Sequence, residues 1–180
     1  MILDSNITFI KDLLLHEHSK FITNKVIDYV GDDPTKFDAL MELFFDDDWL
    51  LNQRAAWPMS YIAIAHPNLI ASYKSRLIDN LYHPSHNAVI RNTLRLFQDI
   101  PIPEEQEGKL FDYCSKLLLQ IKEPVANKIF GMTVMLMIAK PYPELLRELK
   151  VILETQFPYE KPGYKSRAKK TIALIEELTA

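Results

Sequence analysis

The sequence has few glycines, a single cysteine and no long apolar run. Its 180 residues include four glycines, which are too few and too scattered for a turn-rich all-β fold or a glycine-rich phosphate loop. The one cysteine, Cys114, excludes an intramolecular disulfide and a cysteine-based zinc site. The longest apolar run, residues 129–139, is shorter than the roughly 20 residues that span a bilayer. These absences favour a helical protein without a membrane anchor.

Charge and composition define the general class of protein. Apolar residues make up 48% of the chain and charged residues 25%, which is typical of a soluble folded protein and predicts one domain over residues 1–180. The net charge of −3 is not that of a general nucleic-acid binder. The first residues have no basic leader segment, and a lone thiol suits a reducing compartment, so we expect a cytoplasmic location without membrane association.

Apolar residues recur at helical spacing through most of the chain. The segments 69–81, 89–100, 110–121, 145–153 and 168–178 each place apolar side chains three and four positions apart, and no comparable segment alternates with period two. Breaks between these segments contain proline or glycine, as at helix boundaries. Pro58 lies inside one helical segment and predicts a kink or a break there.

Two features repeat in step. Basic residues near the start of every second helix follow one another at intervals of 37, 37 and 39 residues, and they are Arg54, Arg91, Lys128 and Arg167. Prolines at the start of the preceding helix come 24, 25 and 24 residues before the last three, at positions 67, 103 and 143. This spacing predicts tandem helix pairs, four to five in number, with nine or ten helices in total.

The layout resembles that of HEAT-like repeats. In that pattern an apolar residue and an arginine open the second helix, as Ile90 and Arg91 do, with an aspartate six positions before the arginine. Asp48 matches this position ahead of Arg54, whereas lysines stand there ahead of Lys128 and Arg167. The resemblance implies an all-α, right-handed superhelix whose second helices line the concave side.

The same resemblance implies that the concave side binds a partner. We expect a non-catalytic scaffold that holds a peptide or a partner protein, as a monomer or a weak dimer and without a cofactor. The candidate binding residues are Trp49, Arg54, Trp57, Arg91, Asn92, Arg95, Asn127, Lys128 and Arg167. The identity of the partner is not encoded in the pattern, because such repeats serve many functions.

An alternative comes from residues 44–57, which combine two tryptophans, three aspartates and an arginine. HEAT-like alkylpurine DNA glycosylases hold damaged DNA with tryptophans and an aspartate in a basic groove. Here residues 1–50 contain 11 acidic and 4 basic residues, a balance that repels phosphates. The simpler interpretation is that Trp49 and Trp57 belong to the core while Asp46–Asp48 cap a helix. An exposed tryptophan in a basic groove would favour the glycosylase alternative.

The histidines and the cysteine lack the spacing of a metal site or a catalytic site. His16 and His18 would point to opposite sides of a helix, so we expect residues 16–18 to form a polar loop rather than a metal site. His83 and His86 flank a turn without a nearby third ligand. Cys114 lies on an apolar stripe and is expected to be buried, and no nucleophile, base and orienting group come together.

Two further segments each have two possible interpretations. Residues 161–170 hold five basic side chains and no acid, which predicts a solvated helix start or a weak anion contact. The segment 129–139 is apolar nearly all round, which predicts a buried helix or, alternatively, a dimer contact around Met132, Met135 and Met137.

Overall fold

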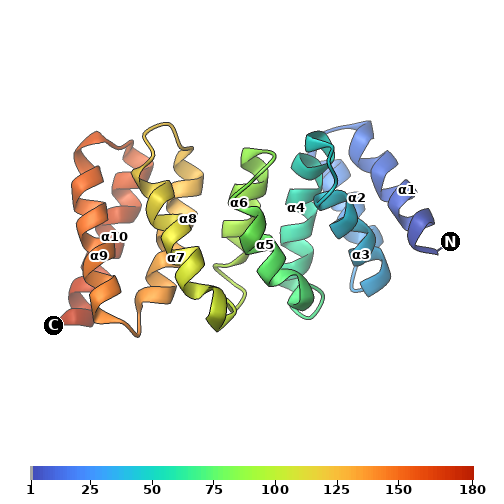
Figure 1. Cartoon of the computed structure of the whole chain (residues 1–180). Helices are drawn as coiled ribbons and strands as arrows, with labels where there is room; N and C mark the ends of the chain where they lie inside the picture. The colour runs from blue at the N-terminus through green and yellow to red at the C-terminus, as the bar shows by residue number, and fades with distance from the viewer. Residues whose placement is uncertain (1) are drawn as a thin grey trace. The chain divides into compact units, whose positions relative to one another are not determined.

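The computed structural model describes residues 2–180 and is helical throughout this range. It contains ten α-helices and two short 3₁₀ helices, with no β-strand in the described range (Figure 1). The contacts divide the chain into two compact units, residues 1–100 (unit 1) and residues 101–180 (unit 2). The all-α fold of repeated helix pairs predicted from the spacing is therefore confirmed, and five pairs are present.

Unit 1 contains three helix pairs. Its elements are α1 (Ile2–His16), α2 (Lys20–Val30), α3 (Pro34–Phe44), α4 (Trp49–Ala65), η1 (Ala71–Tyr73), α5 (Lys74–Asn80) and α6 (Asn87–Leu96). Equivalent helices pack on one another, since α1 contacts α3, and α4 contacts both α2 and α6. The second helices α2, α4 and α6 therefore form one layer of the unit.

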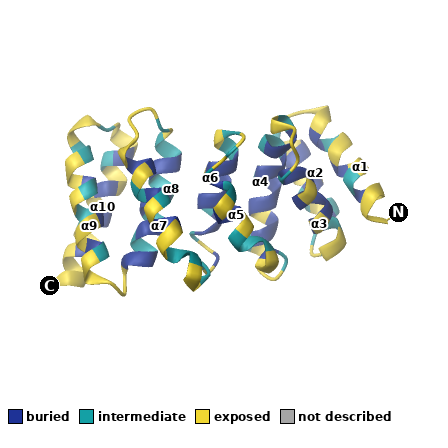
Figure 2. Ribbon diagram, viewed as in Figure 1, coloured by how far each residue is buried: buried dark blue, intermediate teal, exposed yellow. Residues whose placement is uncertain are grey.

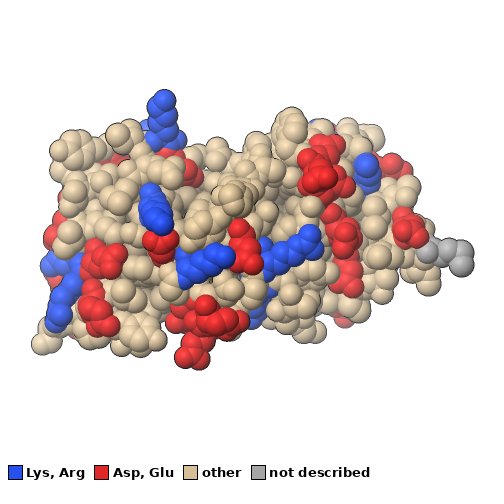
Figure 3. All heavy atoms as spheres, in the orientation of Figure 1, with Lys and Arg blue, Asp and Glu red and all other residues tan. Residues whose placement is uncertain are grey.

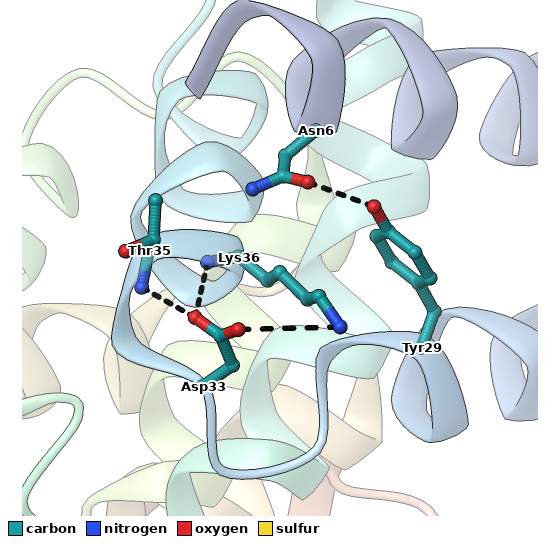
Figure 4. Close-up of polar contacts among 5 residues, drawn as sticks. All are labelled: Asn6, Tyr29, Asp33, Thr35 and Lys36. Atoms are coloured by element: carbon teal, nitrogen blue, oxygen red, sulfur yellow. Dashed lines mark hydrogen bonds and ion pairs between the residues drawn. The ribbon is translucent and has the colours of Figure 1, made fainter. Parts of the chain in front are cut away.

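Local sequence signals determine where these helices begin. Asp33 caps α3, because its Oδ1 accepts hydrogen bonds from the backbone amides of Thr35 (2.9 Å) and Lys36 (3.2 Å) (Figure 4). The Tyr29 hydroxyl donates to Asn6 Oδ1 at 2.8 Å and joins α2 to α1. Pro34 occupies the first position of α3, where a missing N–H costs nothing. Capping and one buried polar contact thus fix the first three helices.

Unit 2 contains two helix pairs. Its elements are α7 (Glu104–Leu119), α8 (Val125–Ala139), α9 (Pro143–Gln156), η2 (Phe157–Tyr159) and α10 (Pro162–Thr179). Helix α7 packs on α8 and α9, and α10 packs on α8 and α9. Figure 2 shows the buried stripes of these helices turned toward their neighbours and the exposed stripes turned outward.

The core of unit 2 forms around α8, as its uniform apolarity predicts. Met132 and Met135 are fully buried and unavailable for the alternative dimer contact, whereas Met137 is partly exposed. Gly131 allows α7 to come close, since a Cβ at this position would lie 3.3 Å from Leu117 Cδ2. Cys114 packs here as well and is buried, as expected.

Helix α4 runs without interruption through Pro58. Of the two predicted effects of Pro58, the break is wrong, because α4 extends from Trp49 to Ala65 with Pro58 buried inside it, and the kink stays a prediction. Proline has no N–H to donate to the carbonyl of Arg54, so one backbone bond is missing. The packing of α4 against α2, α3 and α6 offsets this loss.

Candidate functional site

The outward side of α4 presents a row of large side chains at four-residue spacing. Trp49, Gln53, Trp57 and Tyr61 follow one another at intervals of four and all remain at least partly accessible to solvent. The Trp57 and Tyr61 rings lie 6.5 Å apart. Trp49 and Tyr61 are 54% and 41% exposed, so the interpretation of Trp49 as a core residue is wrong.

An arginine of the neighbouring second helix α6 contacts this row, and a lysine of α2 acts on it electrostatically. The Arg95 guanidinium of α6 lies over the Tyr61 ring, 4.1 Å from its centroid. A hydrogen bond from Arg95 is the main cause of the lowered pKa of Tyr61, followed by a hydrogen bond from Trp57, with smaller effects of the positive charges of Arg95 and of Lys20 on α2. Arg91 is exposed one helical turn before Arg95. We call Lys20, Trp57, Tyr61, Arg91 and Arg95 the cation–aromatic strip.

Charge in unit 1 is segregated by helix. The second helices α2, α4 and α6 carry five basic residues and one acidic residue, Asp28, and neither α4 nor α6 carries an acid. The remainder of residues 1–100 carries four basic and twelve acidic residues. On the face shown in Figure 3, carboxylates form a red band over the α3 region of unit 1. The strip is therefore a local positive area in an acidic unit.

The N-terminal end of α4 is acidic. Asp48 caps the helix, because its Oδ1 accepts a hydrogen bond from the amide of Leu50 at 2.9 Å, and Asp46 Oδ1 accepts one from the amide of Asp48. The capping expected of this aspartate run is confirmed for Asp48, whereas Asp46 holds the turn before the helix; the HEAT-type aspartate is a local cap. Trp49 beside it stacks on His86, with ring centroids 5.9 Å apart.

Arg54 has a structural contact. Its Nη1 donates to the backbone oxygen of Leu14 at 2.6 Å, close to the C-terminal end of α1, where a positive charge is favourable. Asn52, which the sequence analysis did not single out, donates to the backbone oxygens of Leu43 (3.4 Å) and Asp46 (2.7 Å). Both side chains hold helix ends and turns together.

Three of the expected binding residues are buried. Lys128 is 0% exposed and its ammonium is paired with Glu160. Asn127 donates to Glu123 at 2.6 Å, and Asn92 accepts a hydrogen bond from Ser60 at 3.2 Å between α6 and α4. These side chains occupy contacts inside each unit, and burial leaves Lys128 no ammonium surface for a ligand.

The basic segment at the start of α10 is partly balanced by acids. Arg167 and Lys169 are exposed, as expected of a solvated helix start. A hollow of about 390 Å³ between α9 and α10 is lined by Phe157 and Lys169 together with two acids, Glu154 and Glu176. This hollow is therefore mixed in charge.

The histidines and the cysteine occupy ordinary structural positions. The loop expected at residues 16–18 is confirmed for residues 17 and 18 and wrong for His16, which is the last residue of α1; residues 17–19 connect α1 to α2. His86 Nδ1 accepts a hydrogen bond from the Ala88 amide and caps α6. Burial raises the pKa of the Cys114 thiol and keeps it in the unreactive protonated form.

Neither a metal-binding cluster nor a membrane-spanning helix is found among the described residues. Among residues 2–180 no three His, Cys, Asp or Glu side chains are arranged to hold a metal ion. Within the same range, none of the helices has both the length and the apolarity to cross a bilayer.

Two residues of the strip, Tyr61 and Lys20, are not among the residues predicted from the sequence. Tyr61 lies four positions after Trp57, a spacing that places both side chains on one side of a helix. That signal was present in the sequence. The electrostatic effect of Lys20 on Tyr61 was not, because it depends on how α2 packs on α4.

Comparison with known proteins gives a single result on family. A family model described as a HEAT repeat domain matches residues 10–175. Neither the curated proteins nor the solved structures gave a match.

Proposed function

Because the chain belongs to the HEAT repeat family, we propose that it is a non-catalytic scaffold that binds a peptide or partner protein through the second helices of unit 1. HEAT repeats commonly mediate contacts between proteins. Stacked repeats create extended surfaces suited to this task. The cation–aromatic strip supports the second helices of unit 1 as the binding face.

The observation that carries the proposal is the accessible pairing of Arg95 with Tyr61 beside Trp57. Arginine, tyrosine and tryptophan are the side chains most enriched among residues that dominate binding energy at protein interfaces. The Tyr61 ring lies 4.1 Å from the Arg95 guanidinium of α6 and 6.5 Å from the Trp57 ring of α4, in a unit whose remaining segments carry twelve acids and four bases. Arg91 and Lys20 extend the same area.

The glycosylase alternative has one point in its favour, the exposed Trp49. Its neighbours Asp46, Asp47 and Asp48 are exposed carboxylates at the same helix end, and they disfavour a phosphate backbone. Trp49 is also stacked on His86. The local chemistry therefore favours a protein partner.

Site-specific photo-crosslinking in the source cells tests the proposal. A photoreactive phenylalanine analogue replaces Tyr61 in the strip, and the matched control replaces Glu42, which is exposed on α3 of the same unit. We expect a discrete crosslinked protein at position 61 and none at position 42. Equal labelling at both positions, or no protein adduct at position 61, would refute the proposed face. An adduct removed by nuclease would support the nucleic-acid alternative instead.

A further inference from the structure

We propose that the partner segment bound by the cation–aromatic strip is acidic and carries apolar side chains between its carboxylates. This inference rests on the proposed function and specifies the chemistry of its ligand. It follows from three properties of the strip: the absence of local counter-charge, the accessible aromatic rings and the acidic surroundings.

The positive charges of the strip have no carboxylate partner within the described residues. Among residues 2–180, the ion pairs do not include Lys20, Arg91 or Arg95. Arg95 is held over a neutral ring instead, and Arg91 is exposed to solvent. Carboxylates of a partner supply the missing counter-charge, and arginine binds carboxylates through two parallel hydrogen bonds.

The aromatic rings select for more than charge. The Arg95 guanidinium lies over the Tyr61 ring, and the partly exposed Trp57 ring lies beside Tyr61, so a purely charged ligand would leave these aromatic rings without an apolar contact. A segment with leucine or phenylalanine between its acids contacts the rings and the cations together. Most of the binding energy of such contacts comes from burying the aromatic anchors.

The acidic residues around the strip disfavour a long polyanion as its ligand. Outside α2, α4 and α6, residues 1–100 carry twelve acids and four bases, and three of those acids are Asp46–Asp48 at the start of α4. A nucleic acid presents phosphates at regular short intervals along its whole length and would meet these carboxylates. A short acidic segment ends before reaching them, so the charge pattern fits a peptide better than a nucleic acid.

The test uses the full chain and a fluorescein-labelled peptide in which glutamates alternate with phenylalanine and leucine. A matched peptide has every glutamate replaced by glutamine, and single-stranded oligothymidylate serves as the nucleic-acid probe. Fluorescence anisotropy gives the dissociation constant of each. We expect the glutamate peptide to bind at least about tenfold more tightly than the glutamine peptide, with affinity falling as salt rises.

Two protein variants locate the binding. Arg91→Glu reverses an exposed charge of the strip, and Lys11→Glu makes the same change on an exposed position of α1 in the same unit. We expect Arg91→Glu to weaken the glutamate peptide about tenfold and Lys11→Glu to change it less than about twofold. Circular dichroism confirms that both variants remain folded.

The outcomes separate this inference from the proposed function. Equal affinity for the glutamate and glutamine peptides overturns the requirement for acid but leaves a peptide-binding face in place. Failure of both peptides together with a protein crosslink at position 61 also overturns the acidic ligand and retains the proposed function. Failure of both peptides without that crosslink overturns both statements. Preferential binding of oligothymidylate overturns both in favour of a nucleic-acid ligand.

Discussion

The repeat places a basic residue at an equivalent point in α6 of unit 1 and in α8 of unit 2, yet the two side chains have opposite environments. Arg91 is exposed, whereas Lys128 is fully buried and paired with Glu160 from the turn before α10. The Lys128 ammonium also lies 5.8 Å from the centre of the Tyr164 ring. The comparison teaches that repeat position determines where a residue lies on its helix, while the neighbouring helix determines whether it can reach a partner.

The two units differ in the same way across their second helices. In unit 1 the accessible side of α4 is aromatic, and Arg95 of α6 lies over one of its rings. In unit 2 the helix α8 is apolar, with a buried charge, and the basic start of α10 has acidic neighbours in the hollow beside it. Unit 1 therefore exposes aromatic and cationic side chains on its second helices, whereas the second helix α8 of unit 2 buries its charge.

Breaking the buried pair of unit 2 should have the largest effect on stability. Glu160→Leu leaves the Lys128 ammonium buried without a partner, and we expect a loss of about 3–5 kcal/mol in the free energy of unfolding. Replacing both residues, with Lys128→Met and Glu160→Leu, should recover most of it. Urea denaturation followed by circular dichroism measures both effects. A loss below about 1 kcal/mol in the single variant would show that Lys128 is not confined as the structure has it.

Cys114 gives an independent measurement of the same unit. Its thiol is fully buried on α7, and burial raises its pKa, so we expect labelling by a thiol reagent at neutral pH only through opening of unit 2. Glu160→Leu should increase the labelling rate by about one hundredfold or more if its free-energy cost reaches 3 kcal/mol. Rapid labelling of the unmodified protein would contradict the buried position.

Removing a helix cap in unit 1 should have a smaller effect. Asp48→Ala removes the acceptor for the Leu50 amide, and we expect a loss of about 1 kcal/mol. Asp48→Asn retains a capping oxygen and should restore most of the stability. Asp47→Ala is the matched control at the neighbouring exposed aspartate, with an expected change within about 0.5 kcal/mol. An equal loss in the Asp47 and Asp48 variants would rule out capping as the cause.

The smallest stability effect should come from the exposed counterpart of Lys128. Arg91→Met on α6 removes a solvated charge, and we expect a change within about 0.5 kcal/mol. The contrast with the Glu160 variant is what the comparison of the two units predicts. A loss of several kcal/mol would show that Arg91 is a structural residue rather than an available one.

The helical repeat could be predicted from the sequence because its signals are local. Prolines and capping residues lie at the helix boundaries, as Asp33 and Pro34 do at α3, and apolar spacing defines the buried sides. The effect of Pro58 was not predictable in the same way, because the packing of α4 with three other helices decides whether a helix tolerates a proline.

The candidate site was predictable only in part. Trp57, Arg91 and Arg95 were named from their positions in the second helices, and they lie on the accessible side of unit 1. Lys128 fits the same pattern but is covered by Glu160, which lies 32 residues further along the chain. A contact over that separation has no signature in the period of the repeat. The single-domain expectation for residues 1–180 stays a prediction beside the two compact units.

The most direct test of the account maps the contact itself. Backbone amide signals of isotope-labelled protein are followed by NMR while the glutamate peptide is added. The account predicts that the perturbed amides cluster at residues 53–61 of α4 and 88–95 of α6, with α10 unchanged. Perturbations centred on residues 161–170, or spread evenly over the acidic helices of unit 1, would contradict the assignment of binding to the cation–aromatic strip.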